Sequence, residues 1–135
     1  MIDIHTHLGR FRRDQGWLTE AMLVQRMDEM GIDRAVVLPL GVSPEAISFG
    51  FTNEQALEAC ARFPARLIPF CNLDPRLMGN RSTTDFSWLL EHYRALGCRG
   101  VGELVCGLHF DDPRTVNLLR QCGEANLPVI YHAAS

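Results

Sequence analysis

Four side chains that can bind a metal ion lie near the ends of short apolar segments. His5 and His7 are separated by one residue in "MIDIHTHLG", Glu103 lies in "RGVGELVCG", and His132 lies in "LPVIYHA". Neutral imidazole and carboxylate groups are nitrogen and oxygen ligands suited to zinc and other divalent transition metals. The pattern predicts a divalent metal site with zinc as the expected ion, and the predicted ligands are His5, His7, Glu103 and His132. Glu103 is also the candidate catalytic residue.

The histidine pair is a weak signal by itself. With five histidines in 135 residues, two of them lie one residue apart by chance in roughly one sequence of seven. Its position at the end of a predicted strand strengthens the signal, because independent histidine and acidic side chains also end later predicted strands. The alternative is a structural role, in which the histidines are satisfied core residues and Glu103 pairs with Arg34 or Arg99.

The two remaining histidines carry less information. His92 lies between Glu91 and Tyr93 on the polar side of a predicted helix, which indicates a surface position. His109 lies in the loop after the fourth predicted strand, where it points toward substrate or solvent.

The elements that must position these side chains alternate regularly between strand and helix. Short apolar runs predict five strands, at 2–7, 34–40, 66–73, 99–107 and 127–133. Caps and periodic apolar positions predict four helices between them, beginning after Thr19, after Thr52, near Phe86 and after Asp112. This alternation predicts an α/β fold with parallel strands, either a doubly wound sheet or part of a (β/α)8 barrel.

Side-chain alternation along the first strand suggests where the histidines point. Asp3, His5 and His7 share one face of an extended strand, whereas Ile2 and Ile4 share the other. We expect the apolar pair to face the helices. In a barrel, the histidines would then lie inside, near the carboxyl-terminal mouth where active sites gather.

Composition excludes several classes of protein. One domain covering residues 1–135 is expected from the length and from the 47% hydrophobic content. The chain lacks an apolar run of about 18 residues and a signal-peptide core, so we expect a cytoplasmic protein without a membrane span. The net charge of -3 argues against nucleic-acid binding. The sequence contains no lysine, which excludes Schiff-base and P-loop chemistry. Five widely spaced cysteines predict buried reduced thiols rather than disulfides.

Four segments resemble the amidohydrolase superfamily of metal-dependent TIM-barrel hydrolases, especially its amidohydrolase-related branch. These segments are "DIHTHLG", "GIDRAVVLP", "GVGELV" and "LPVIYHA", so the resemblance extends along the whole chain. The resemblance implies that His5, His7 and His132 are metal ligands. A carboxylated lysine on the fourth strand, which bridges two metals in many members, is impossible here. Glu103 stands at the equivalent strand, in a context similar to the TatD-like nucleases, whose fourth-strand glutamate binds metal.

The resemblance implies a metal-dependent hydrolase that uses a metal-activated water on a small-molecule substrate. One alternative is a metal-dependent decarboxylase of a small unsaturated or aromatic acid, and another is a non-catalytic half-barrel that serves as an assembly module. Members of the family also take a histidine from the sixth strand and an aspartate from the eighth. The chain resembles only the first five strands of such a barrel. We therefore expect a homo-oligomer or a missing C-terminal half, and weak or absent hydrolysis by these 135 residues alone.

Overall fold

The computed structural model describes residues 1–10, 16–46 and 49–132. Within them the strands are β1 (Ile2–Thr6), β2 (Arg34–Val37), β3 (Leu67–Pro69), β4 (Val101–Leu104) and β5 (Val129–Tyr131). The helices are α1 (Glu20–Met30), α2 (Asn53–Arg62), α3 (Ser87–Ala95) and α4 (Pro113–Glu124), with a short 3-10 helix, η1 (Pro44–Ala46). All paired strands are parallel, which confirms the predicted α/β fold of five strands and four helices.

The strand order follows the sequence, although the ladder is interrupted. One sheet has the order β1-β2-β3 and the other pairs β4 with β5. Between them, Cys71 and Val101 form an isolated parallel bridge, and the Arg99 amide donates to the Pro69 carbonyl. The strands thus run in the order 1-2-3-4-5 expected of a partial barrel, rather than the 3-2-1-4-5 order of a doubly wound sheet.

Local sequence signals set the helix boundaries. The hydroxyl of Thr19 accepts from the Met22 amide at the start of α1, and Gly31 ends that helix in the left-handed region at φ 67°. Thr52 and Gln55 form the predicted capping box of α2. These contacts satisfy backbone groups that the first and last turns of a helix leave without partners.

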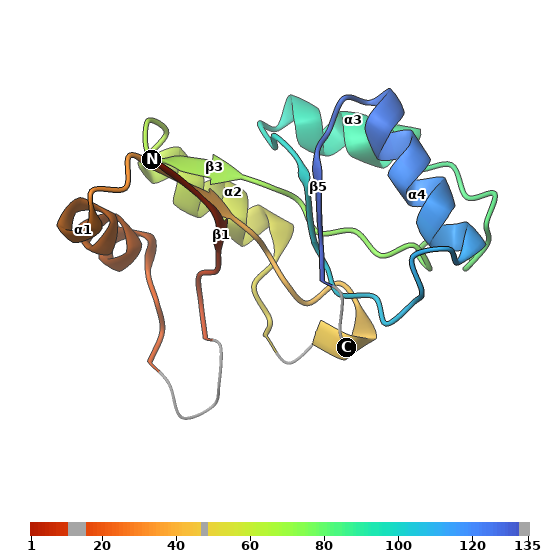
Figure 1. Cartoon of the computed structure of the whole chain (residues 1–135), viewed down its shortest axis with the longest axis horizontal. Helices are drawn as coiled ribbons and strands as arrows, with labels where there is room; N and C mark the ends of the chain where they lie inside the picture. Colours follow the sequence, from red (N-terminus) through yellow and green to blue (C-terminus); the bar gives the residue numbers. More distant parts are fainter. Residues whose placement is uncertain (11–15, 47–48, 133–135) are drawn as a thin grey trace.

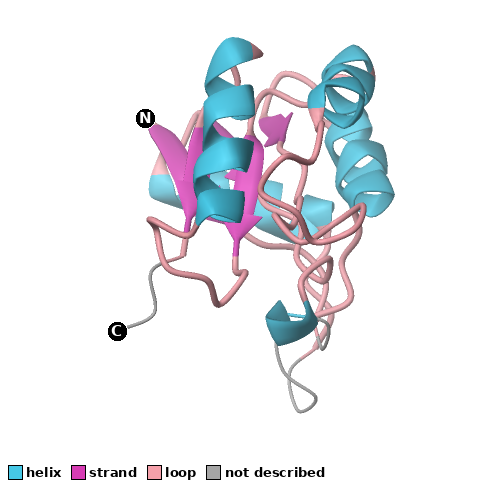
Figure 2. Ribbon diagram, turned by 90° about the vertical axis from the view of Figure 1, so that its right-hand side faces the viewer, coloured by secondary structure: helices cyan, strands magenta, loops and turns pink. Residues whose placement is uncertain are grey.

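Helices and strands pack in two main clusters (Figures 1 and 2). The first buries Met27 of α1 and Cys60 of α2 against Val37 of β2. The second buries Leu90 of α3 and Leu118 of α4 against other apolar residues from β4 and the neighbouring loops. A third cluster, containing Val36, Leu38 and Phe70, lies on the opposite face of the strands from the helices.

One expectation about β1 is wrong. Ile2 and Ile4 are 54% and 64% exposed, so they do not pack against helices in the described part of the chain. β1 is an edge strand of its sheet, so it has a neighbouring strand on one side only. The register also shifts between Asp3 and Thr6, which breaks the strict alternation assumed for this strand.

The cysteines agree with the prediction from composition. All five cysteines are buried and free, and burial raises the pKa of both Cys60 and Cys122 to about 12. These thiols are therefore protonated and unreactive at neutral pH. Among the described helices, none combines the length and the apolar character needed to cross a bilayer.

Candidate metal centre

The carboxyl ends of β1, β4 and β5 bring the predicted ligands together. β1 and β5 run in the same direction (Figure 1), so their carboxyl ends lie on one side of the molecule. β4 lies against β5 because residue 102 is glycine. A Cβ atom there would lie 2.6 Å from the Ile130 carbonyl oxygen, and the φ of Gly102 is 145°. This close approach places Glu103, the next residue, beside the end of β5.

Three ligand atoms form an almost equilateral triangle. His5 Nε2 lies 3.1 Å from His7 Nε2 and 3.2 Å from Glu103 Oε2. The third side, from His7 Nε2 to Glu103 Oε2, measures 3.1 Å. These three residues are the group of possible metal ligands found among the described residues.

A backbone hydrogen bond orients one imidazole of this triangle. His7 Nδ1 lies 2.9 Å from the Leu38 carbonyl oxygen, which can only accept, so this ring nitrogen carries a proton. His7 Nε2 is then the ring nitrogen that faces His5 Nε2 and Glu103 Oε2. A metal cation could contact all three of these atoms at once.

The environment of Glu103 points the same way. The residue is 4% exposed, and the contacts of its carboxylate are imidazoles. In residues 1–10, 16–46 and 49–132, no arginine lies within ion-pair distance of it, so the alternative pairing with Arg34 or Arg99 is wrong. A buried carboxylate needs compensating positive charge. A divalent cation bound between Glu103 and the histidine pair would supply it.

The fourth predicted ligand takes a different position. His132 Nδ1 lies 2.7 Å from Glu103 Oε1, the carboxylate oxygen that faces away from the histidine pair. His132 therefore contacts the site through Glu103 and stands outside the triangle. Its role as a metal ligand stays a prediction.

The dimensions of the triangle fit a transition-metal ion. Ligands about 2.0–2.1 Å from zinc lie about 3.3 Å from one another in a tetrahedral site, and about 2.9 Å apart at the right angles of an octahedral one. The observed separations of 3.1–3.2 Å lie between these values. A donor set of two imidazoles and one carboxylate suits zinc, iron and manganese.

The other candidate residues lie farther from this centre. His92 is exposed on α3, as predicted, with its ring packed edge-on against Tyr93. Asp3 does not point freely into the site, because its Oδ1 accepts a hydrogen bond from the His5 amide. His109 is exposed and lines a hollow of about 360 Å³.

That hollow opens beside the candidate metal centre. His132 forms part of its wall, together with Glu45 and the stacked rings of Phe110 and Tyr131, whose centroids are 4.1 Å apart. The Tyr131 hydroxyl donates to the Leu108 carbonyl oxygen at 2.6 Å, which fixes the ring. A small flat molecule placed here would lie next to His132.

Two buried polar groups near the centre were missed from the sequence. Asn72, just after β3, donates a hydrogen bond to the backbone carbonyl of Glu103. The Asp74 carboxylate accepts hydrogen bonds from the Ser43 hydroxyl and the Arg76 guanidinium. Arg76 also donates two hydrogen bonds to the Glu45 carboxylate. Burial of Asp74 acts to raise its pKa, but the hydrogen bonds from Arg76 and Ser43 outweigh it and the pKa is lowered. Both groups follow β3, so the strand-end rule applied to His5 and Glu103 would have indicated them.

Comparison with known proteins rests on structure. No family model and no curated protein sequence matches the chain. A probable 2-pyrone-4,6-dicarboxylic acid hydrolase from Acinetobacter baumannii, solved with citric acid bound, matches over 98% of this chain with a TM-score of 0.63 and 25% identity. An amidohydrolase II matches over 97% with a TM-score of 0.68 and 16% identity. The chain has the fold of half an amidohydrolase-superfamily barrel.

The chain spans about half the length of the first two proteins, and less of a third. It covers 49% of both the hydrolase and the amidohydrolase II. A third match, a 5-carboxyvanillate decarboxylase from Novosphingobium aromaticivorans with bound manganese and a nitrobenzoic acid, covers 84% of this chain and 34% of that one. Its TM-score is 0.57 at 21% identity. The matches thus include both hydrolases and decarboxylases, and one of them binds manganese.

Proposed function

We propose that this chain binds a divalent metal ion through His5, His7 and Glu103, and that it supplies the metal-binding half of a hydrolase of the amidohydrolase type. The observation that carries the proposal is the triangle of two imidazole nitrogens and one buried carboxylate oxygen, each about as far from the others as ligands of one ion. The structural matches to hydrolases of this superfamily support the reaction class.

The chain's own residues have distinct roles in this proposal. A bound divalent metal would lower the pKa of a water molecule toward about 7 and polarise a substrate carbonyl. The bond from His7 Nδ1 to the Leu38 carbonyl orients the ring so that Nε2 faces the ion. Glu103 binds through Oε2 and is our candidate for moving the proton of the water. His132 holds Oε1 and thereby fixes the plane of the carboxylate.

Zinc is our proposed ion, with manganese as the alternative suggested by the decarboxylase match. The test is to load the purified chain with each ion and to measure stoichiometry and affinity by titration calorimetry. We expect one ion per chain and a loss of binding in His7→Ala. His92→Ala is the matched control, because it removes an exposed histidine from α3. A wild-type chain that binds neither ion would contradict the proposal.

Decarboxylation of a small aromatic acid is the second candidate reaction. It is favoured by matches to a 5-carboxyvanillate and a 2,6-dihydroxybenzoate decarboxylase, and by the ring stack of Phe110 and Tyr131 beside His132. Metal-loaded protein should be assayed for lactone hydrolysis and for release of carbon dioxide from aromatic acids. Absence of both activities, with metal binding intact, would favour the non-catalytic half-barrel.

The edges of the fold lead to a proposal about partners. β1 and β5 are end strands, and Ile2 and Ile4 on β1 are exposed. Open strand edges and exposed apolar side chains favour association. We expect the 135-residue chain to self-associate unless a complementary half-barrel covers these edges, and sedimentation at increasing concentration measures this directly. A monomer at every concentration would contradict it.

A further inference from the structure

Asn72 connects the carboxyl end of β3 to the main chain of Glu103. Its side chain is 1% exposed, and its Nδ2 donates a hydrogen bond to the backbone carbonyl oxygen of Glu103. The carboxylate of the same glutamate contacts His5, His7 and His132. The bond therefore acts on the backbone of the residue that holds the candidate metal centre together.

Asn72 is itself fixed in place by a second asparagine. Asn53 is the first residue of α2 and is 4% exposed. Its Oδ1 accepts from the Asn72 amide at 2.7 Å, and its Nδ2 donates to the Asn72 carbonyl at 3.1 Å. These two bonds hold the backbone of Asn72 as a paired strand would. A chain of hydrogen bonds thus connects α2, through Asn53 and Asn72, to the backbone of Glu103.

The side-chain oxygen of Asn72 indicates that packing alone does not explain an asparagine at this position. Asn72 Oδ1 is buried without a hydrogen-bond partner among the described residues. Leaving a buried acceptor unpaired costs free energy, and an apolar side chain of similar size would avoid that cost. What distinguishes asparagine at this position is the donor that reaches Glu103. Reversing the amide would bring two acceptors together and lose that bond.

We propose that Asn72 is a positioning residue that fixes the backbone of Glu103, so that its carboxylate faces the histidine pair and the metal ion. The inference rests on the proposed function, because it assigns Asn72 to the same metal centre. Partners that orient ligands in this way typically change metal affinity by about 10- to 100-fold. Because Asn72 holds the main chain of Glu103 rather than its carboxylate, we expect the lower end of that range.

The experiment measures manganese affinity and the paramagnetic resonance spectrum of the bound ion in wild type, Asn72→Ala and Asn72→Asp. Asn72→Asp keeps the shape of the side chain but, when ionised, lacks the donor. Both variants should bind manganese about 10-fold more weakly, with an altered spectrum. Asn53→Ala should also weaken manganese binding, because Asn53 holds Asn72 in place. This variant replaces the Asn72 variants in the test if neither of them folds.

Asn117→Ala is the matched control for stability. Asn117 is also a buried asparagine that donates to a backbone carbonyl, that of Thr84, but it lies on α4. It should lower the melting temperature while leaving manganese affinity and the spectrum unchanged. If the Asn72 variants lose stability but keep wild-type manganese affinity, the positioning role is wrong and the metal site stands. If wild type binds neither manganese nor zinc, the proposed function fails and this inference fails with it.

Discussion

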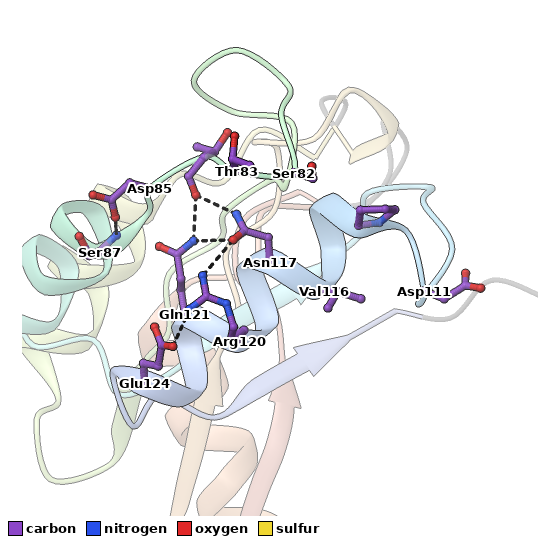
Figure 3. A pocket seen from close by; sticks show the side chains of 12 residues that line it. Ser82, Thr83, Asp85, Ser87, Asp111, Val116, Asn117, Arg120, Gln121 and Glu124 are labelled. Carbon is purple, nitrogen blue, oxygen red and sulfur yellow. Dashed lines mark hydrogen bonds and ion pairs between the residues drawn. The ribbon is translucent and has the colours of Figure 1, made fainter.

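A large hollow and the candidate metal centre use polar groups in different ways. The hollow, about 830 Å³, lies between α4 and the segment that leads into α3 (Figure 3). There each main donor has an acceptor: Gln121 Oε1 accepts from the Phe86 amide, and Gln121 Nε2 and Asn117 Nδ2 both donate to the Thr84 carbonyl oxygen. At the candidate metal centre, two imidazole nitrogens and one carboxylate oxygen face one another instead.

The large hollow is not where the possible metal ligands lie, because none of them forms part of its lining. The amides in the large hollow are satisfied by the protein itself and hold the segment before α3 against α4. The triangle of His5, His7 and Glu103 brings together three ligand atoms that could hold a metal ion. The convergence of these ligand atoms, rather than the volume of a hollow, is what indicates the candidate site.

Removing the carboxylate from the triangle should have the largest effect. Glu103→Gln takes away the anionic ligand, so zinc affinity should fall by at least about 100-fold, or about 2.7 kcal/mol. Titration calorimetry measures this change. Gln121→Ala, in the large hollow, should leave zinc affinity unchanged. Equal zinc affinities in Glu103→Gln and wild type would show that Glu103 is no more a metal ligand than Gln121.

Gln121 in the large hollow should matter for stability rather than for metal binding. Gln121→Ala leaves the Phe86 amide without its partner and weakens the hold on the Thr84 carbonyl, so unfolding should become easier by about 2–3 kcal/mol. Denaturant titration measures this loss. Val116→Ala, at an exposed position of the same helix, should change stability by no more than about 0.5 kcal/mol. A small effect of Gln121→Ala would mean that water replaces the hydrogen bonds of Gln121. These bonds would then not be what holds the segment before α3 against α4.

The sequence predicted the fold better than it predicted the details of the site. Caps such as Thr52 with Gln55, and the regular alternation of apolar segments, depend on local interactions and were correct. The convergence of His5, His7 and Glu103 followed from the rule that parallel strands end on one side. The position of His132 on the far carboxylate oxygen and the bond from Asn72 depend on contacts between segments distant in sequence, which periodicity does not encode. The exposure of Ile2 and Ile4 depends on which strand lies at the edge.

A third cluster of polar groups, formed by Arg76, Asp74 and Glu45, is held by complementary charges. Arg76 binds both Asp74 and Glu45, and its hydrogen bonds are the main cause of the lowered pKa of Glu45. The pKa of Asp74 is lowered as well, since Arg76 and Ser43 outweigh the effect of burial. Carboxylates with lowered pKa values stabilise the fold above their unfolded pKa values of about 4, and this stabilisation is lost as the pH falls through the folded pKa values.

Arg76→Gln should therefore lower the free energy of unfolding by about 1.5 kcal/mol at pH 7. The difference from wild type should shrink below about pH 4, because protonation removes the same interactions from wild type. Denaturant titrations at a series of pH values measure both effects. A difference that stays constant down to pH 2 would show that Arg76 acts through packing rather than charge.

The smallest effect is expected from the charged pair at the rim of the large hollow. Arg120 pairs with Glu124 at 2.5 Å, and both side chains are more than half exposed. Solvent screening leaves such a pair little net energy, so Arg120→Gln should change the free energy of unfolding by no more than about 0.5 kcal/mol. Millimolar phosphate should not raise the melting temperature of either protein, because Arg120 already has Glu124 and Asn117 as partners. Stabilisation of wild type but not of Arg120→Gln by phosphate would show that this hollow binds an anion and is a candidate site in its own right.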